Sequence, residues 1–446
     1  MKKALWLSLL ISQLLVIAGF WAWTHTHHAM GNQLTGGVAG KLLAYGRLAG
    51  LLAAFGVLLQ LTLIGRVRWV ERIFGLDRLS RLHHIAGFLL LIVLLAHPFL
   101  VNTGHALQAG VGRWAQFLDF CRTWDDVLPA AIGLAIIVVA LLLSAVFVAG
   151  RIGYETWHAT HLLLYIAVIL AFGHQLAVGS DFTGNEWFTA YWRGLYIVVV
   201  GSFVFYRFIR PLWLFFRHRF IVAGLTLESG DVTSVRIEGR NLEAFHAEAG
   251  QFVIVRFLAP GFRWEAHPFS ISMRPDGKQI RLTIKGLGDY TRRIPDLKPG
   301  TRVIIDGPHG IFTVRRCVSD RVLMIAGGIG ITPVRSVAEE LVAGGRDVVL
   351  LYGNRNGTSV VFERELRDLV AASSGRLKVV CVMSDDAGWP GEKGRIDQDR
   401  ILRLVPDVRE RDVYLCGPPV MMRLIRASLL KLRVPKRRVY YERFAL

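Results

Sequence analysis

Histidines recur in the most apolar part of the chain, where an ionisable side chain is costly to keep. Two largely uncharged stretches carry three histidines each: His83, His84 and His97 in the first, and His158, His161 and His174 in the second. Neutral imidazole is a common axial ligand of haem iron, and an iron held by two histidines suits electron transfer. We therefore interpret these side chains as haem ligands or their neighbours rather than as unrelated packing residues.

The spacing of the histidines places them at two depths. His83 and His97 are 14 residues apart, which in a helix is about 21 Å along the axis and leaves both on one face within about 40°. His161 and His174 are 13 residues apart, or about 20 Å. Each stretch thus brings one histidine near either membrane surface, and facing pairs would hold two haem irons, one in each leaflet.

The 13-residue spacing leaves an alternative open. In a straight helix it turns His174 about 140° away from the face of His161, so a tilt or a distortion near Gly173 is needed. His84 and His97 have the same 13-residue spacing, so His84 or His158 could replace a proposed ligand; otherwise both are interfacial neighbours. A further cluster, His25, His27 and His28, is either a polar cap of a loop or a site for iron.

The elements that carry these histidines are six predicted membrane spans. Uncharged or nearly uncharged runs of about 18 residues or more can cross the hydrocarbon layer as helices, and they occupy residues 4–23, 48–65, 85–112, 127–150, 159–180 and 187–210. We interpret the first run as an uncleaved span rather than a signal peptide. The chain is 53% hydrophobic and 20% charged, a composition that excludes disorder and an ordinary soluble enzyme.

The charges indicate orientation rather than nucleic-acid binding. The formal net charge is +19, but much of the positive charge lies in loops that flank the spans and in the C-terminal tail. With the N-terminus in the cytoplasm, most Lys and Arg of the first half fall on the inner side, as the positive-inside rule requires. The second half is then cytoplasmic. Four dispersed cysteines without a CxxC motif exclude a disulfide framework and a zinc site.

The second half of the chain has the pattern of two soluble domains. Short β-rich runs over residues 225–312 predict a small antiparallel β-barrel. From Arg321 onward, buried-type strands alternate with helices, which predicts a parallel α/β sheet. The expected domains are a six-helix transmembrane haem-binding domain (1–216), a β-barrel domain (217–316) and an α/β nucleotide-binding domain (317–446).

Four short motifs in this half favour nucleotide cofactors. Residues 324–333 (MIAGGIGITP) form a strand, a glycine-rich turn and the start of a helix, an arrangement that lets backbone N–H groups approach a pyrophosphate. Residues 416–419 (CGPP) follow another strand. The motifs HPFS (267–270) and GDYT (288–291) lie in the predicted barrel and could hold the phosphates and ring of a flavin. Each motif alone is compatible with an ordinary turn, but the four motifs in this order are much stronger evidence for nucleotide cofactors.

With these motifs in place, the chain from about Leu42 onward resembles the NADPH oxidase and ferric reductase transmembrane family, in a bacterial form with a ferredoxin–NADP reductase-like module. The resemblance implies His83, His97, His161 and His174 as axial ligands of two haem b groups, with His83 paired to His161 and His97 to His174. It implies FAD binding by His267, Pro268, Phe269, Ser270, Ser272, Thr291 and Phe444. It implies NAD(P) binding by Gly327, Gly328, Ile329, Gly330, Thr332, Cys416, Gly417 and Pro418, with Cys416 and Phe444 beside the site of hydride transfer.

Arg355 follows the strand beneath the expected adenosine end. A guanidinium there can pair with a 2′-phosphate, which favours NADPH over NADH.

The expected function is a transmembrane oxidoreductase that carries electrons from NAD(P)H through FAD and two haems to a ferric complex or dioxygen. The resemblance implies a bacterial inner membrane as its location. Oxygen-reducing members of the family tend to carry a second histidine four residues after the outer ligand, where this chain has Val101. The alternative is a haem-binding membrane electron carrier that serves a quinone or a partner protein.

Overall fold

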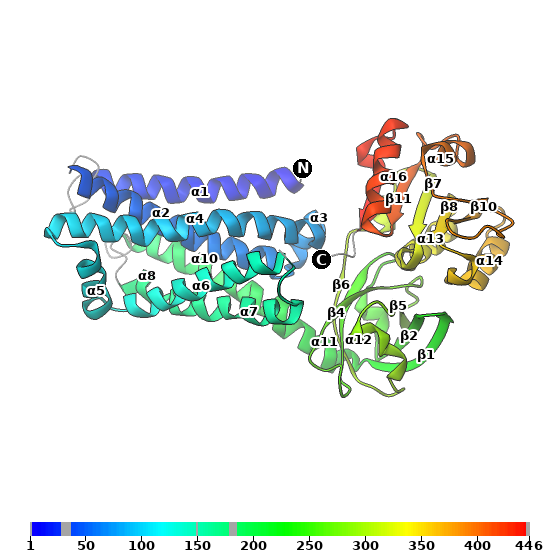
Figure 1. Ribbon diagram of the computed structural model, residues 1–446, viewed down its shortest axis with the longest axis horizontal. Helices are drawn as coiled ribbons and strands as arrows, with labels where there is room; N and C mark the ends of the chain where they lie inside the picture. Colours follow the sequence, from blue (N-terminus) through cyan, green and yellow to red (C-terminus); the bar gives the residue numbers. More distant parts are fainter. Residues whose placement is uncertain (1, 28–36, 149, 178–184, 443–446) are drawn as a thin grey trace. The chain divides into compact units, whose positions relative to one another are not determined.

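The computed structural model describes residues 2–27, 37–148, 150–177 and 185–442. The chain divides into two compact units (Figure 1). The membrane unit consists of Met1–Val67 and Leu79–Val204, and the reductase unit consists of Arg68–Arg78 and Phe205–Leu446. The reductase unit therefore includes a short segment that lies, in sequence, between two long apolar helices.

The membrane unit is a bundle of long helices that run roughly along one axis (Figure 1). Within the described residues, six helices are long and apolar enough to cross a membrane, which confirms the six predicted spans. The helices are α1 (Lys2–His27), α2 (Gly37–Ile64), α4 (Leu76–Ala109), α6 (Val127–Val148), α7 (Tyr154–Leu170) with α8 (Gly173–Ala177), and α10 (Glu186–Val204). A helix satisfies its own backbone hydrogen bonds, and for that reason apolar runs of this length adopt it in lipid. The chain is a multi-pass membrane protein.

Glycines allow the helices to approach closely. A Cβ atom on Gly133 of α6 would lie 2.8 Å from the backbone oxygen of Ala167 in α7, and one on Gly46 of α2 would lie 2.8 Å from the Val101 side chain of α4. Small residues at such crossings permit backbone contact, which is how helices pack in membranes. The large apolar side chains on the outer face of α4, such as Phe88 and Ile92, are exposed and suited to lipid.

A short amphipathic helix, α5 (Arg113–Thr123), joins α4 to α6 and was not predicted. Its Trp114 and Phe117 rings stack at 5.6 Å. The last span, α10, continues into a π-helical turn (Phe205–Ile209) and then into α11 (Arg210–His218). Both of these segments belong to the reductase unit.

The first half of the reductase unit is built from two antiparallel three-stranded sheets. One has the order β1 (Ile221–Ser229), β2 (Val232–Glu238), β5 (Gln279–Lys285), and the other the order β4 (His267–Ser270), β3 (Phe252–Phe257), β6 (Val303–His309). Buried side chains from both sheets, including Val235, Val253 and Leu282, fill one core.

The prediction of an antiparallel β-barrel is therefore wrong in one respect, because the two sheets do not join into a closed barrel. Between the two sheets the described residues make only isolated bridges, at Ile221–Arg302 and Ile271–Leu282. Strand β4 has four residues, and one of them is Pro268, which has no N–H to donate to a ladder. The chain reaches the other sheet only just beyond the end of β4, where Ile271 bridges Leu282 and the N–H of Ser272 donates to the carbonyl of Arg281 at 2.9 Å.

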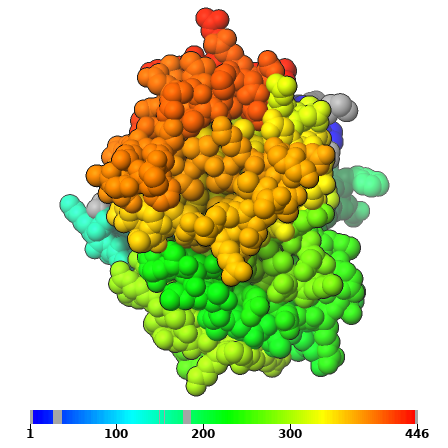
Figure 2. All heavy atoms as spheres, turned by 90° about the vertical axis from the view of Figure 1, so that its right-hand side faces the viewer, coloured from blue at the N-terminus to red at the C-terminus, as the bar shows by residue number. Residues whose placement is uncertain are grey.

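The second half contains the predicted parallel sheet. Its order is β10 (Glu392–Lys393), β9 (Leu377–Met383), β8 (Asp347–Asn354), β7 (Arg321–Gly327), β11 (Asp412–Cys416), β12 (Val439–Glu442). Helices α13 (Ile331–Ala343) and α14 (Glu363–Ala372) cover one face, and α15 (Gln398–Leu404) and α16 (Pro419–Lys431) cover the other. Figure 2 shows this half, in yellow to red, packed against the green antiparallel half. Because both faces are covered, the strands are almost continuously apolar.

Candidate functional site

Four of the predicted histidines meet in two pairs inside the membrane unit. Helix α4 supplies His83 and His97, α7 supplies His161, and α8 supplies His174. The ring centroids of His83 and His161 are 6.1 Å apart, and those of His97 and His174 are 6.2 Å apart. The pairs are the ones that the family resemblance implied, whereas His84 and His158 are exposed.

A break in the fifth span brings His174 to this position. Helix α7 ends at Leu170, two residues form a turn, and α8 begins at Gly173. A Cβ atom at Gly173 would lie 2.6 Å from the Asp126 carboxylate, so only glycine fits there without a shift. The turn changes the helical phase, and the 13-residue spacing then delivers the second histidine to the same side as the first.

The backbone of α2 holds His97. The Nδ1 atom of His97 lies 2.8 Å from the carbonyl oxygen of Gly46. A carbonyl can only accept, so Nδ1 carries the proton and Nε2 presents a lone pair. Metal-bound histidines commonly donate their other N–H in this way. Among the described residues, the buried Nδ1 atoms of His83, His161 and His174 have no hydrogen-bond partner.

The separation of each pair fits two axial ligands of one metal ion. With metal–imidazole bonds of about 2 Å on either side and ring radii of about 1.1 Å, two such ligands place their centroids about 6 Å apart. Within the described residues, no three His, Cys, Asp or Glu side chains converge as a metal cluster. Two imidazoles are the protein ligands that a haem iron needs, so the donor set fits haem.

The side chain of Ser270 suits contact with a cofactor. It ends β4, is 6% exposed, and its hydroxyl has no hydrogen-bond partner among the described residues. A buried polar atom of this kind ordinarily has a partner, so a flavin would satisfy it. The hydroxyl of Tyr290 is buried and unpartnered in the same part of the chain, and its ring lies 4.1 Å from that of His267. Burial raises the pKa of Tyr290, which keeps its hydroxyl protonated as a donor.

Other predicted flavin residues already have protein partners. Thr291 accepts hydrogen bonds from the N–H groups of Leu287 and Gly288, at 3.0 Å each, and so caps helix α12 (Asp289–Arg292). Ser272 is fully buried and bonds to Thr283 and to the carbonyl of Arg281. Pro268 and Phe269 lie in β4, where they pair with Ile254 and Val253. Phe444 lies outside the described residues.

The glycine-rich turn lies at the carboxyl edge of the parallel sheet. Gly327 ends β7, a short turn spans Gly328–Gly330, and α13 begins at Ile331. Gly328 has φ +51° and open space around its Cα, whereas a Cβ at Gly330 would lie 2.5 Å from the carbonyl oxygen of Cys416. The hydroxyl of Thr332 donates to the carbonyl of Ile329 at 3.0 Å and holds the turn. The turn presents backbone to a ligand at a helix start, as a pyrophosphate site requires.

The CGP segment follows the neighbouring strand. Cys416 ends β11, which pairs with β7, so Gly417 and Pro418 lie against the glycine-rich turn. Burial raises the pKa of the Cys416 thiol, and the nearby Glu442 carboxylate raises it further. The thiol is thus neutral beside the turn, which suits packing against an uncharged ring rather than nucleophilic attack.

The adenosine end of a dinucleotide would reach β8 and β9, since these strands continue the carboxyl edge away from β11. Arg355 follows β8 and is exposed, and its carbonyl accepts a hydrogen bond from Asp385 after β9, at 2.8 Å. The adjacent Asp386 accepts from the N–H of Gly357 at 3.1 Å. The segment after β9 thus brings two acidic residues, Asp385 and Asp386, next to the backbone that follows β8, a feature that the prediction from Arg355 alone missed.

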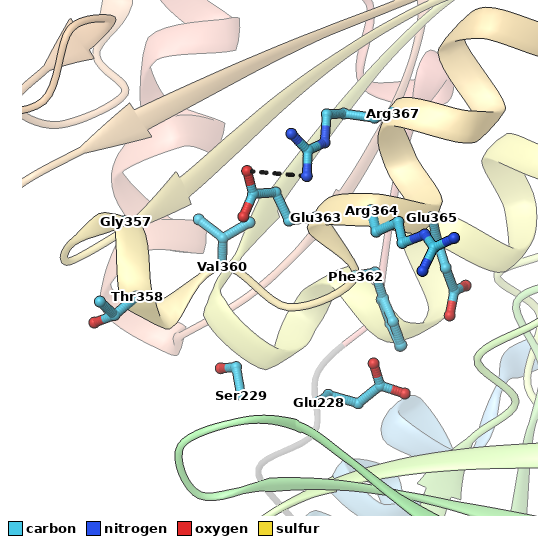
Figure 3. Close-up of a pocket in the computed structure, with 10 residues that line it drawn as sticks. All are labelled: Glu228, Ser229, Gly357, Thr358, Val360, Phe362, Glu363, Arg364, Glu365 and Arg367. Atoms are coloured by element: carbon cyan, nitrogen blue, oxygen red, sulfur yellow. Dashed lines mark ion pairs between the residues drawn. The ribbon is translucent and has the colours of Figure 1, made fainter.

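A pocket of about 520 Å³ lies elsewhere in the reductase unit (Figure 3). It is lined by Glu228 and Ser229 at the end of β1 and by residues between Gly357 and Arg367. In Figure 3 the Phe362 ring points toward Glu228, and Glu363 pairs with Arg367. None of the predicted site residues lines it.

Beside this pocket, an ion-pair network was missed by sequence reasoning. Glu365 accepts from both terminal nitrogens of Arg281, at 2.6 and 3.0 Å, and lies 2.9 Å from Arg335. Arg281 lies in β5, whereas Arg335 and Glu365 lie on helices of the parallel-sheet half. The network thus ties the two halves of the reductase unit together, and no local pattern in the sequence signals a contact over such separations.

Three family models match successive parts of the chain. Residues 49–172 match the ferric reductase-like transmembrane component, residues 217–313 an FAD-binding domain, and residues 324–427 an oxidoreductase NAD-binding domain. The chain therefore combines a ferric reductase-like transmembrane component with an FAD-binding domain and an oxidoreductase NAD-binding domain. Its domain combination is that of the NADPH oxidase and ferric reductase family with a ferredoxin reductase-like module, which confirms the resemblance stated above.

The curated relatives match about half of this chain. They include the reductase subunit of glycine betaine monooxygenase from Chromohalobacter salexigens, 29% identical over 49% of this chain and 61% of that protein. The flavohemoprotein of Schizosaccharomyces pombe is 32% identical over 50% of this chain and 56% of that protein. The chain spans about half to three fifths of the length of such relatives. Among solved structures, the flavohem-like FAD/NAD-binding domain of nitric oxide dioxygenase from Vibrio cholerae is 23% identical over 50% of this chain and 97% of that chain, with a TM-score of 0.45.

Proposed function

We propose that this chain passes electrons from NAD(P)H on the cytoplasmic side, through FAD and two b-type haems, to an acceptor on the opposite side of a bacterial inner membrane. The acceptor is a ferric complex or dioxygen. The observation that carries the proposal is the two histidine pairs, each at the separation of two axial ligands. Three of the four histidines lie within the residues that match the ferric reductase-like component. The same chain holds the FAD- and NAD-binding domains.

The residues divide the work in a definite way. His83 with His161, and His97 with His174, would hold the two haem irons, and His83 and His97 are separated by about 21 Å along α4. The hydroxyls of Ser270 and Tyr290 would face the flavin, and the backbone of Gly327–Gly330 would receive the pyrophosphate. Cys416, buried and neutral, would pack beside the nicotinamide. The chemistry that FAD supplies when bound is the conversion of a hydride into single electrons, which haem iron carries one at a time.

The choice between NADPH and NADH depends on the carboxyl edge of β8 and β9. Arg355 supplies a cation for a 2′-phosphate, and this favours NADPH. Asp385 and Asp386 oppose a phosphate and instead suit the free 2′-hydroxyl of NADH. In this proposal both NADPH and NADH are therefore substrates. The preference between them is modest, and single substitutions should be able to change it.

The test uses the purified full-length protein in detergent. We expect two low-spin haems with bis-histidine ligation for each chain, and haem reduction after anaerobic addition of NADPH or NADH. Oxygen consumption is then compared with reduction of a ferric chelate and of a soluble quinone. A preparation whose spectrum lacks haem contradicts the membrane half of the proposal. Reduction of quinone alone replaces it with the electron-carrier function.

A further inference from the structure

Helix α13, which begins at the glycine-rich turn, is bonded to the antiparallel half of the reductase unit. The hydroxyl of Ser336 donates to the carbonyl of Met273 at 2.7 Å, and Ser336 is fully buried. The carboxylate of Glu339 accepts a hydrogen bond from the backbone N–H of Arg274 at 2.9 Å. Both contacts join α13 to the residues that directly follow the predicted flavin motif (267–272). All of these residues belong to one compact unit.

Glu365 reinforces this contact from a second helix, α14. Its carboxylate accepts from both terminal nitrogens of Arg281 in β5, at 2.6 and 3.0 Å, and lies 2.9 Å from Arg335 on α13. The two guanidiniums in turn donate to one backbone carbonyl, that of Ser272, at 2.9 and 3.2 Å. Two cations from different halves of the unit thus share one oxygen of the flavin motif, and Glu365 contacts both of them. We call Glu365, Arg281 and Arg335 the Glu365 network.

The Glu365 network is largely shielded from water. The side chains of Arg281 and Arg335 are 13% and 11% exposed, and that of Glu365 is 32% exposed. Burial raises the pKa of Glu365, but hydrogen bonds and charges from Arg281 and Arg335 outweigh this effect and lower it below its ordinary value. Both guanidiniums also lie over the ring of Phe362, at 4.7 and 5.8 Å from its centroid. Removal of the carboxylate would leave a buried charge uncompensated, which is strongly unfavourable.

Arg281 depends on Glu365 more than Arg335 does. Among the described residues, Arg281 has no ion-pair partner other than Glu365. Arg335 has a second partner, Glu339 at 2.8 Å, on its own helix. Without Glu365, Arg281 should therefore move toward water and release the Ser272 carbonyl. The other bonds of α13 to the antiparallel half would remain, so the two halves would stay attached but would be less firmly oriented.

We propose that Glu365 is a positioning residue for hydride transfer: by holding the guanidiniums of Arg281 and Arg335 in place, it fixes the glycine-rich turn relative to the flavin motif. This inference rests on the proposed function. In the step concerned, NADH loses a hydride, which is one proton with two electrons, and becomes NAD⁺, while the flavin is reduced by two electrons. Displacement by about 1 Å can cost about 100-fold in rate where two reacting groups must be held in register. Loss of Glu365 should therefore slow hydride transfer and leave the turn, and with it NADH binding, intact.

The experiment measures flavin reduction, NADH affinity and amide hydrogen exchange in the full-length protein. Glu365→Gln removes the charge but keeps the shape, and its flavin should be reduced about tenfold more slowly than that of wild type, with unchanged NADH affinity. The amides of residues 272–274, which include the Arg274 N–H bonded to Glu339, should exchange faster, and this readout requires no reaction. Glu363→Gln makes the same change of charge at an exposed position of α14. It is the matched control and should alter none of the three measurements.

A second substitution tests whether Glu365 acts through Arg281. Arg281→Met removes the guanidinium, keeps an unbranched apolar side chain, and should also slow flavin reduction. Because residues that act as a unit have non-additive effects, the double variant should be no slower than the slower of the two single variants. Effects that multiply in the double variant would overturn the proposed network.

The outcomes separate the network from the proposed function. If NADH does not reduce the flavin of the wild-type protein, the proposed function fails, and the inference fails with it. If Glu365→Gln is reduced as fast as a functional wild type, or residues 272–274 exchange as in wild type, the positioning role is refuted. A merely structural role would weaken NADH binding together with the rate, and this result also overturns it. If Glu365→Gln does not retain FAD, Ser336→Ala, which loses the bond to the Met273 carbonyl, is measured in the same way: slower flavin reduction with unchanged NADH affinity supports the proposal, and an unchanged rate refutes it.

Discussion

The two units of this protein build their sites from different material. In the membrane unit, the proposed site consists of four side chains, and helix packing brings them together in pairs. In the reductase unit, the dinucleotide turn is largely backbone, shaped by glycines at Gly327, Gly328 and Gly330. Several side chains there that the sequence motifs singled out are already bonded within the protein. Replacement of one histidine should therefore abolish haem binding at its site, whereas substitutions around the nucleotide site should weaken nucleotide binding by smaller, graded amounts.

The largest effect is expected at the outer histidine pair. His97→Leu removes one axial ligand and should lower the haem content from two to about one per chain, because a haem iron of this kind needs both imidazoles. Reduction of external acceptors should fall by about 100-fold or more, since loss of a ligand exceeds the 10–100-fold cost of losing a ligand's hydrogen-bond partner. Haem content and acceptor reduction are measured together with flavin reduction, which should persist. Unchanged external reduction would remove His97 from the electron path.

A packing change behind His97 should act on the same pair without removing the ligand. A Cβ at Gly50 would lie 2.8 Å from the His97 ring, so Gly50→Ala should displace the imidazole from the Gly46 carbonyl. Loss of such a partner typically costs about 10–100-fold in affinity or activity. The control is Gly194→Ala on α10, where no atom lies within 4 Å of the new methyl group. Equal haem spectra in the two variants would show that the backbone bond does not hold the outer ligand.

Two alanine substitutions in the glycine-rich turn should distinguish the cost of a steric clash from the cost of an unfavourable backbone conformation. Gly330→Ala places a methyl group 2.5 Å from the carbonyl of Cys416 and should destabilise the turn by about 1–3 kcal/mol. Gly328→Ala meets open space but forces a side chain into the left-handed region, at a cost of about 1–2 kcal/mol. We expect the KM for NADH to rise in both, more in Gly330→Ala, with haem content unchanged. A larger effect at Gly328 would mean that the ligand, not Cys416, occupies the space around the turn.

The smallest effects are expected at the edge of the adenosine site. Arg355→Ala should lower kcat/KM for NADPH about tenfold more than for NADH, which corresponds to ~1.4 kcal/mol. Asp385→Asn should shift the ratio in the opposite direction, because it removes a negative charge that repels a 2′-phosphate. Steady-state kinetics with both dinucleotides measure the ratio. If both variants lose activity equally with the two substrates, neither side chain contacts the 2′ position.

The spans and the parallel sheet were predictable because their signals are local. Apolar runs and strand–turn–helix motifs act over 10 to 20 residues, which is the range of helix and strand periodicity. The pairing of histidines was inferred from the resemblance, and spacing supplied the expectation of a distortion near Gly173. The break between α7 and α8 confirms that expectation. The contact that requires glycine at this position, with Asp126, lies 47 residues away, and the sequence does not signal it.

The missed features are long-range contacts. Glu71 lies in a segment rich in arginine, and the sequence therefore favoured a membrane-flanking loop; its partner Gly310 is 239 residues away. The closure of the barrel depends on which strand edges meet, and the short β4 with its Pro268 leaves the edges joined by single bridges. The roles of Glu442 and Glu365 likewise depend on contacts with residues in other helices and strands. No periodicity or motif in the sequence encodes such encounters.

Because of the turn after Leu170, the fifth span can tolerate a change in length that the third span cannot. One residue inserted or deleted at this non-helical joint can be absorbed by a change in the turn, while His174 stays opposite its partner. In α4, the same change between His83 and His97 would rotate everything beyond it by about 100° and carry the outer imidazole away from its mate. Homologous chains should accordingly vary in length at the joint while keeping the histidine interval of the third span constant.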